Sequence, residues 1–323
     1  MTFSFYQQVV QALRASRHPL LVLLKDVDAD AIGSTMALAY ALREQGATPT
    51  IFCLAEIPAS LFFLLDPRIP FVQEFSLLDR ASIDAITVVD AGHLGRTGIE
   101  AELTELKNAG VPLLNIDHHE MAAPFGSINL VDVNASATTV LVYDVLKLGG
   151  WTISRDIATA VLTGIIADTG NFSNGGTTIR ALEIAAHCYA KGAESRRIIT
   201  ELYRSKPFDA LKLWGDILAR LTKNETLGIV STVILQEDFV HHQIDDESTE
   251  GLANFLNGIG NMRAALILKE LPNGEVRGSL RTTRDDVNVG ALAAALGGGG
   301  HRKAAGFTIT GRIEKRGNGW QVV

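Results

Sequence analysis

Short apolar runs alternate with stretches of helical periodicity over residues 1–190 of the chain. The apolar runs have no polar alternation, which is typical of strands buried on both faces of a sheet. Strands are predicted at 20–24, 50–54, 86–90, 112–116 and 128–132, and helices at 32–45, 137–148, 154–167 and 177–191. Strands joined by helices predict an α/β fold, with a parallel sheet covered by helices on both faces.

The pattern changes beyond residue 190. Residues 191–212 are charged and helical in pattern and are predicted to form a linker. After it, strands near 227–235, 263–269 and 275–281 and a helix near 288–296 predict a smaller α+β domain, residues 213–323. We therefore expect two domains, 1–190 and 213–323.

Composition narrows the class of protein. The 323 residues are 47% hydrophobic, enough to bury two cores. The apolar runs are far shorter than the roughly 20 residues of a membrane span, and the N-terminus has the pattern of a surface helix. We expect a cytoplasmic protein that does not enter membranes. The net charge of −7 argues against a broad basic surface for long duplex nucleic acid.

Acidic residues follow almost every predicted strand of the first domain. They are Asp26, Asp28 and Asp30 after the first strand, Asp90 after ITVVD, Asp117 in NIDHH and Asp168 in the helical segment TGIIADTGNF. In an open parallel sheet these positions meet in one crevice. Carboxylates about 4 Å apart repel by roughly 1 to 4 kcal/mol per pair, so the cluster needs cations. Carboxylates with an imidazole favour Mn²⁺ or Mg²⁺ over a thiolate-seeking metal.

Each of these residues alone has a simpler explanation. An Asp after a strand is commonly a turn residue or a helix cap, and we prefer that interpretation for Asp26 taken by itself. A single DHH or DTG segment is a weak signal, because short motifs recur by chance. Four acidic places in the order DxDxxGS, D, DHH and D are hard to attribute to chance, which favours one shared site.

Five segments together resemble the DHH phosphoesterase family with its DHH-associated C-terminal domain. These segments are DVDADAIGS, VVDAGHLGR, NIDHH, ADTGNF and ALGGGGHRKAAGF. They are spread along the sequence, so the resemblance covers nearly the whole chain. Within the family, the two-domain length is similar to that of the nanoRNase/pAp phosphatase group. Its members degrade very short oligoribonucleotides and remove the 3′-phosphate of adenosine 3′,5′-bisphosphate (pAp). The resemblance makes residues 1–190 the catalytic domain and 213–323 the substrate-binding domain.

The resemblance also implies roles for single residues. Asp28 would bind one metal ion and Asp30 the other, and Asp90 would bridge them. His118 and Asp168 would complete the coordination of the second metal ion. The implied cofactor is a pair of Mn²⁺ ions, with Mg²⁺ possible. The implied catalytic residues, beside the phosphate, are His119 and Asp117.

One position departs from the family pattern. The family commonly has a histidine four residues before the position of Asp28, and this chain has Leu24, which cannot ligate a metal. Either Asp26 takes the vacant place, or the first metal ion binds more weakly or not at all. A smaller departure is Ala137 in NASATTV, where the family often has Ser.

Glycines and basic residues near the C-terminus are candidates for phosphate binding. Alone, GGGG would be a flexible turn; the resemblance favours a phosphate cradle, with His301 beside the expected start of a helix. Arg281, at the end of a predicted strand, has a guanidinium suited to phosphate. The full set of predicted substrate-binding residues is Arg96, Arg281, Gly298, Gly299, Gly300 and His301.

These features predict a metal-dependent phosphoesterase in which two metal ions activate water. The expected partners are short single-stranded RNA or dinucleotides and pAp, and a homodimer is possible. Two alternatives stay open: a cyclic or linear dinucleotide phosphodiesterase, and a catalytically weak nucleotide-binding protein, which the Leu24 departure would favour.

Overall fold

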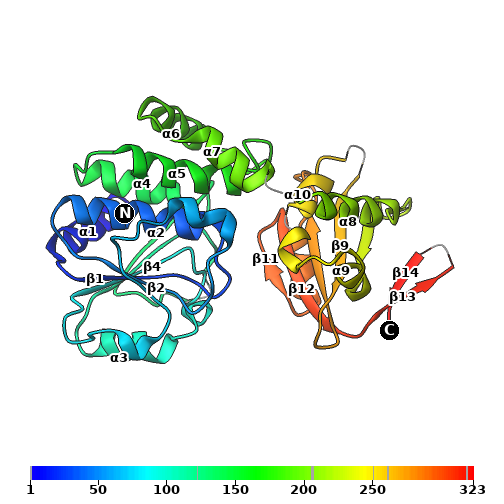
Figure 1. Ribbon diagram of the computed structural model, residues 1–323, viewed down its shortest axis with the longest axis horizontal. Helices are drawn as coiled ribbons and strands as arrows, with labels where there is room; N and C mark the ends of the chain where they lie inside the picture. The colour runs from blue at the N-terminus through cyan, green and yellow to red at the C-terminus, as the bar shows by residue number, and fades with distance from the viewer. Residues whose placement is uncertain (1, 122, 205–206, 250, 260–261, 318) are drawn as a thin grey trace. The chain divides into compact units, whose positions relative to one another are not determined.

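The computed structural model describes residues 2–121, 123–204, 207–249, 251–259, 262–317 and 319–323. The chain folds into two compact units, Met1–Arg204 and Ser205–Val323 (Figure 1). Residues that we predicted to form the linker contribute to both units: α7 (Ser195–Ile199) belongs to the first, and α8 (Phe208–Ala219) begins in the second.

A six-stranded parallel sheet forms the centre of the first unit, in the order β3-β2-β1-β4-β5-β6. Its strands are β1 (Pro19–Val22), β2 (Thr50–Phe52), β3 (Phe71–Val72), β4 (Ala85–Val89), β5 (Leu113–Asp117) and β6 (Ile128–Val131). The predicted parallel sheet is confirmed. Strand β3 was missed because two residues are too short to leave a pattern.

Helices cover both faces of this sheet, as predicted. They are α1 (Thr2–Ala15), α2 (Ala29–Glu44), α3 (Glu100–Asn108), α4 (Thr138–Leu148), α5 (Arg155–Asp168), α6 (Ile179–Ala190) and α7, with short helices η1 (Ala59–Leu64), η2 (Phe75–Leu77), η3 (Leu94–Thr97) and the π-helix η4 (Thr200–Arg204). Figure 1 shows α1, α2, α4 and α5 on one face and α3 on the other. Helix α3 was not predicted, because it buries only Leu103 and has little apolar stripe.

Side chains of the first strand alternate between two cores, which explains its uninterrupted apolar sequence. Leu21 and Leu23 pack in the cluster on the α2 side of the sheet. Leu20, Val22 and Leu24 pack in the cluster on the α3 side, and Leu24 is 0% exposed. Leu24 therefore supplies an apolar side chain to this second core and no metal ligand.

Helices α2 and α5 pack closely, and this packing places two acidic residues at the same end of the sheet. A Cβ atom on Gly33 of α2 would lie 2.6 Å from the Ala160 carbonyl oxygen of α5, so only glycine fits there. Asp30 is in the first turn of α2 and Asp168 is the last residue of α5. The close contact therefore fixes the spacing between these two side chains.

The second unit has a mixed sheet in the order β11-β12-β10-β9-β8-β7, where β8 and β9 are parallel and the other neighbours antiparallel. Its strands are β7 (Thr222–Asn224), β8 (Ile229–Ile234), β9 (Ala264–Glu270), β10 (Glu275–Arg281), β11 (Gly299–Gly300) and β12 (Ala304–Thr310), and β13 (Ile313–Arg316) and β14 (Gly319–Val322) form a hairpin. Its helices are α8, α9 (Gln236–His242), the 3-10 helix η5 (Asp246–Thr249), α10 (Leu252–Leu256) and α11 (Val289–Ala295). This arrangement confirms the predicted α+β fold.

The glycine-rich segment is followed by a strand. We expected the start of a helix beside His301, Arg302 and Lys303. In the sequence these residues lead into strand β12, whose Ala305 and Phe307 alternate with more exposed neighbours and enter the core. Gly299 and Gly300 form β11 and pair with Gly306 and Ala305 of β12. The helix N-terminus that lies near His301 is that of α11, where the Val289 N–H donates to the Arg302 carbonyl oxygen at 2.9 Å and a Cβ atom on Gly290 would lie 3.0 Å from the His301 carbonyl oxygen.

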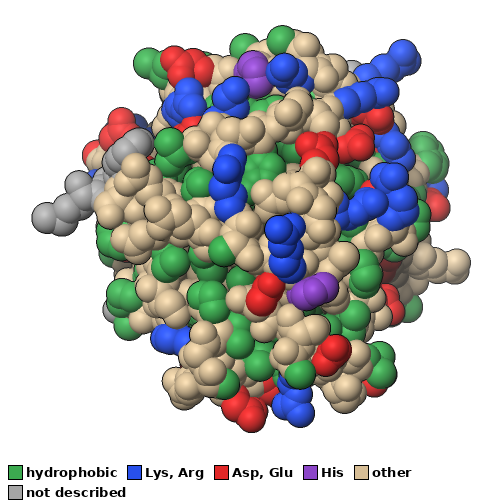
Figure 2. Space-filling model, turned by 90° about the vertical axis from the view of Figure 1, so that its left-hand side faces the viewer, with side chains coloured by type: hydrophobic (Ala, Val, Ile, Leu, Met, Phe, Trp, Pro, Cys, Tyr) green, Lys and Arg blue, Asp and Glu red, His purple; other side chains and the backbone are tan. Residues whose placement is uncertain are grey.

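Charge is divided unequally between the units. The first contains 15 basic and 22 acidic residues and accounts for the whole net charge, whereas the second contains 14 of each. Figure 2 shows one face of the first unit, where positive and negative side chains are interspersed among neutral ones.

Among the described residues, none of the helices is both long and apolar enough for a membrane span. Cys53 and Cys188 are buried free thiols.

Candidate active site

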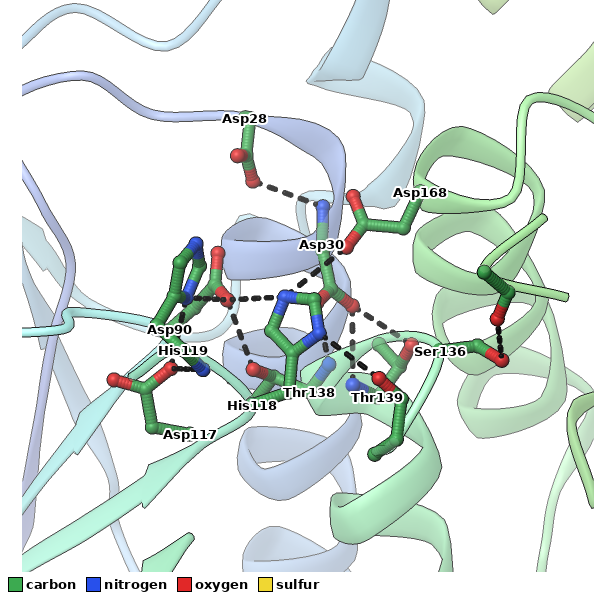
Figure 3. A network of polar contacts seen from close by, with 12 residues as sticks. Asp28, Asp30, Asp90, Asp117, His118, His119, Ser136, Thr138, Thr139 and Asp168 are labelled. Carbon is green, nitrogen blue, oxygen red and sulfur yellow. Dashed lines mark hydrogen bonds and ion pairs between the residues drawn. The ribbon is translucent and has the colours of Figure 1, made fainter. Parts of the chain in front are cut away.

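The carboxyl ends of three neighbouring strands bring the DHH segment and the other acidic residues together. Strand β4 lies between β1 and β5, with Val22 paired to Val88 and Val89 paired to Ile116. Asp28 and Asp30 follow β1, Asp90 follows β4, and Asp117 ends β5. Figure 3 shows these side chains pointing toward one another, with Asp168 approaching from α5.

Asp30, His118 and Asp168 form the first group, with ligand atoms that all lie within 4.8 Å of one another. His118 Nε2 lies 3.2 Å from Asp168 Oδ2 and 3.5 Å from Asp90 Oδ1. The other ring nitrogen, Nδ1, lies 3.2 Å from the Ala135 carbonyl oxygen. The backbone contact fixes the orientation of the ring, so that Nε2 faces the carboxylates.

Asp90, Asp117 and His119 form the second group within the same 4.8 Å limit. His119 Nδ1 lies 2.9 Å from Asp117 Oδ1 and 3.4 Å from Asp90 Oδ1. Asp117 also accepts hydrogen bonds from the backbone N–H groups of Gly92 and His119. Asp117 therefore orients His119, and it does so from a fully buried position.

Asp90 lies between the two groups and has an unusual backbone conformation. Its φ is +61°, in the left-handed region that non-glycine residues seldom adopt. The conformation turns the chain sharply at the end of β4 and directs a buried carboxylate, 1% exposed, toward both histidines. Strained residues of this kind cluster at functional sites.

Burial and mutual repulsion raise the pKa values of four carboxylates, those of Asp28, Asp30, Asp90 and Asp168. Burial raises the pKa of Asp30 to about 7; the Asp90 charge adds to this, and His118 and a Thr139 hydrogen bond oppose it. Burial likewise raises the pKa of Asp90 to about 6, with the Asp28 charge second and a His119 hydrogen bond in opposition. Without a cation, these carboxylates take up protons near neutral pH.

The histidines are shifted in the direction that balances this negative charge. Burial by itself would lower the pKa of His118, but its hydrogen bond to Asp168 and the nearby carboxylates raise it to about 9. The pKa of His119 rises to about 10, because hydrogen bonds to Asp117 and Asp90 outweigh its burial. Protons on the imidazoles thus supply the positive charge that the carboxylates require.

The donor set fits a divalent cation. It combines several carboxylate oxygens with one imidazole nitrogen, and both sulfur atoms of the cysteines lie elsewhere, in the apolar cluster on the α2 side of the sheet. Oxygen and imidazole ligands suit Mn²⁺ and Mg²⁺. A cation here would replace the protons that now balance the buried carboxylates.

Asp28 and the nearby residues Asp26 and Leu24 lie in surroundings that differ from those of the two clustered groups. Asp28 is exposed and caps α2, where its Oδ1 accepts hydrogen bonds from the N–H groups of Asp30 (3.1 Å) and Ala31 (2.9 Å). Asp26 is exposed and belongs to neither group of clustered ligand atoms. Leu24 is buried on the α3 side of the sheet.

The predicted phosphate-binding residues are distributed over both units. Arg96 lies in η3 of the first unit, half-buried, with Nη1 3.5 Å from the Asp90 carbonyl oxygen. Arg281 ends β10 in the second unit, and His301 follows β11. Two glycines of the cradle have a packing reason, since a Cβ on Gly298 would lie 2.1 Å from the Gly306 carbonyl oxygen and one on Gly300 would lie 2.6 Å from Ala305 Cα.

Gly299 differs from its two neighbours. A Cβ atom there would meet nothing within 4 Å, so packing does not explain this glycine. Of the three predicted cradle glycines, Gly299 therefore has the backbone most open to a ligand.

Sequence reasoning missed Thr138 and Thr139, which begin α4 and contact the acidic residues directly. The Thr138 hydroxyl donates to Asp90 Oδ1 at 2.8 Å, and the Thr139 hydroxyl donates to Asp30 Oδ1 at 2.8 Å (Figure 3). The available signal was the segment NASATT directly before an apolar helix, which by itself is typical of an ordinary helix start.

Taken together, the sheet and its buried carboxylates and imidazoles define a hydrolase of phosphoester bonds that works with metal ions. The chain belongs to the DHH family: residues 21–165 match the DHH family, N-terminal domain, and residues 228–318 match the DHHA1 domain.

Curated relatives and a solved structure agree with this assignment. The chain is 32% identical over 314 residues to the bifunctional oligoribonuclease and PAP phosphatase NrnA of Thermus thermophilus, covering 94% of this chain and 88% of the relative. It is 26% identical to the Bacillus subtilis protein of the same description, covering 87% and 86%. An exopolyphosphatase-related protein from Bacteroides fragilis, 22% identical, has the same fold, with a TM-score of 0.84 over 98% of this chain and 92% of that one.

Proposed function

We propose that this phosphoesterase hydrolyses short oligoribonucleotides and the 3′-phosphate of pAp, with manganese as its metal. The observation that carries the proposal is the convergence of Asp30, Asp90, His118 and Asp168 at one end of the parallel sheet, all in a chain of the DHH family. The substrate class is supported by the two relatives described as oligoribonuclease and PAP phosphatase.

The residues have distinct roles in the proposed reaction. Asp30, His118 and Asp168 would hold one cation, Asp28 would contribute to a second, and Asp90 would be shared by the two. When bound, the cations supply Lewis-acid activation of water and neutralise charge on the phosphate oxygens. Four carboxylates and two divalent cations leave the site nearly neutral, so an anionic substrate is not repelled.

His119 and Asp117 act together beside the cations. Asp117 and Asp90 contact His119 Nδ1 and so fix the orientation of the ring. In the absence of a cation, these hydrogen bonds raise the pKa of His119 to about 10. A protonated imidazole can donate a hydrogen bond to a phosphate oxygen or to the leaving oxygen.

The second unit supplies substrate binding in this proposal. Its proposed phosphate-binding groups are Arg281, His301 and the backbone of Gly299, and the proposed phosphate-binding residue of the first unit is Arg96. A guanidinium can form two parallel hydrogen bonds to one phosphate, which makes Arg281 the residue best suited to anchor the chain end.

The experiment is a comparison of substrates with the purified full chain in Mn²⁺. We expect release of mononucleotides from a diribonucleotide and of inorganic phosphate from pAp. A matched reaction with His118→Asn is the control for contaminating nucleases. Faster hydrolysis of a cyclic dinucleotide, pyrophosphate or polyphosphate would contradict the proposed substrate class.

The opposite outcome is binding without turnover. If the chain binds a dinucleotide in Mn²⁺ and hydrolyses none of these substrates, the nucleotide-binding alternative replaces the enzyme proposal. A homodimer and a cytoplasmic location stay predictions of the sequence.

A further inference from the structure

Helix α4 begins with a residue that cannot cap it. Its N-cap is Ala137, which makes no side-chain hydrogen bond to the helix. The first N–H groups of a helix have no partner within the helix and need an acceptor when they are buried. Thr138 and Thr139 are both 0% exposed, so water cannot supply it.

The Asp30 carboxylate, from a different helix, supplies the missing acceptor. Thr138 N–H donates to Asp30 Oδ2 at 2.5 Å, and Thr139 N–H donates to Oδ1 at 3.0 Å. The Thr139 hydroxyl adds a third hydrogen bond, to Oδ1 at 2.8 Å. Both carboxylate oxygens are therefore anchored, and the positive end of the α4 dipole lies beside them.

The neighbouring hydroxyl contacts a different carboxylate. Thr138 Oγ1 donates to Asp90 Oδ1 at 2.8 Å, so two successive residues of one helix turn hold Asp30 of α2 and Asp90 at the end of β4 (Figure 3). These two carboxylates lie on separate elements, and the first turn of α4 is a rigid link between them.

The surrounding packing leaves little room for another arrangement. A Cβ atom on Gly164 of α5 would lie 2.3 Å from Asp30 Oδ1 and 2.6 Å from Thr139 Oγ1. Glycine at this position therefore lets α5 pass directly behind the hydrogen bond between Asp30 and Thr139. Any larger residue would push the carboxylate or the hydroxyl away.

Other buried threonines in this unit use their hydroxyls differently. Thr159, Thr163 and Thr169 donate to the carbonyl oxygen four residues earlier in their own helical segment. Such bonds are local and touch no acidic side chain of the site. Thr138 and Thr139 instead direct both hydroxyls into the acidic cluster.

We propose that Thr138 and Thr139 are positioning residues, which fix the separation and orientation of the Asp30 and Asp90 carboxylates and so set the affinity and geometry of the cation site. The inference rests on the metal centre of the proposed function but not on its nucleotide substrate. Outer partners of this kind typically change metal affinity by about 10 to 100-fold when removed.

The experiment compares serine and alanine at each position, because both lose the methyl group and only alanine loses the hydroxyl. Mn²⁺ affinity and stoichiometry are measured by titration calorimetry on the full chain. We expect Thr139→Ala and Thr138→Ala to weaken Mn²⁺ binding by about 10 to 100-fold. Thr139→Ser and Thr138→Ser should stay within about threefold of the parent, since each retains the donor.

Thr163→Ala is the matched control. Thr163 is buried and its hydroxyl bonds only to the Thr159 carbonyl oxygen, so the variant loses comparable packing and should bind Mn²⁺ like the parent. If the Thr138→Ala and Thr139→Ala variants lose thermal stability but keep the Mn²⁺ affinity of the parent, the two threonines have a purely structural role.

The outcomes separate this inference from the substrate proposal. Equal affinities for the serine and alanine variants at both positions overturn it, as does a parent chain that binds no Mn²⁺. A selective loss in the alanine variants supports it even if no nucleotide is hydrolysed. Where an alanine variant does not fold, valine at the same position, which keeps the volume and removes the hydroxyl, gives the same comparison.

Discussion

Asp30 and Asp28 are two residues apart in the sequence, yet their carboxylates have contrasting surroundings. Asp30 is 0% exposed and is held by three hydrogen bonds from α4, beside His118 and Asp168. Asp28 is exposed and is held by two N–H groups of its own helix. We call these the Asp30 side and the Asp28 side of the site.

This difference shows that carboxylates of one cluster can differ in their affinity for a cation. The Asp30 side is preorganised, because its ligands come from three elements and are fixed by outer hydrogen bonds. The Asp28 side has Leu24 in an apolar core where the family commonly has a histidine. We therefore expect one tightly bound cation on the Asp30 side and a weaker one on the Asp28 side.

The largest expected effect comes from removing a ligand on the Asp30 side. His118→Asn should lower kcat/KM for the proposed substrate by about 1,000-fold, since about 4 kcal/mol of transition-state stabilisation depends on a correctly held cation. The measurement is steady-state hydrolysis of a diribonucleotide across Mn²⁺ concentrations. Asp66→Asn is a control, because Asp66 pairs with Arg43 and Arg68 outside the site. A variant that keeps more than a tenth of the activity would contradict this ranking of the sides.

The next effect is the pH dependence of Mn²⁺ binding. Cation binding requires the ionised carboxylates and a neutral His118, and without a cation their pKa values are about 7 for Asp30, about 6 for Asp90 and about 9 for His118. All three groups are more protonated at lower pH, so affinity rises with pH. We expect a change of about tenfold or more per pH unit between pH 6 and 8.

Titration calorimetry in buffers of different ionisation enthalpy counts the protons released and checks this directly. Asp26→Asn should show the same pH slope as the parent, because Asp26 belongs to neither cluster. A flat affinity between pH 6 and 8 would mean that the Asp30 side carries no exchangeable protons.

A moderate effect is expected from restoring a ligand on the Asp28 side. Leu24→His should tighten binding of the second Mn²⁺ by about tenfold, which is about 1.4 kcal/mol, at some loss of thermal stability because Leu24 is fully buried. The test is Mn²⁺ stoichiometry at low free metal, with Leu24→Met as the control of similar volume. If the parent chain already binds two ions with equal affinity, the contrast between the sides is wrong.

The smallest effect is expected at Asp26. Asp26→Asn should change Mn²⁺ affinity and turnover by less than about threefold, since an exposed carboxylate interacts weakly through water. A larger loss, confined to the second Mn²⁺, would show that Asp26 takes the vacant ligand place.

The sequence alone determined much of the fold. The strands of the first unit are buried on both faces, so their apolar runs mark them regardless of tertiary context, and Asp90 and Asp117 follow such runs directly. The sequence also indicated that the acidic segments after these strands meet, because the carboxyl ends of neighbouring parallel strands lie at one edge of the sheet. Strand β12 was not predicted, because the glycine and basic residues before it carry no periodicity that separates a helix from a strand.

Only the tertiary structure decided how the acidic residues differ from one another. Burial of Asp30 depends on α2, α4 and α5 packing around it, and its contacts with Thr138 and Thr139 join residues more than 100 positions apart. Exposure of Asp28 depends on the same packing. A sequence pattern records which side chains are acidic. The free energy of holding their charge depends on solvent access and neighbouring dipoles, which exist only once the chain is folded.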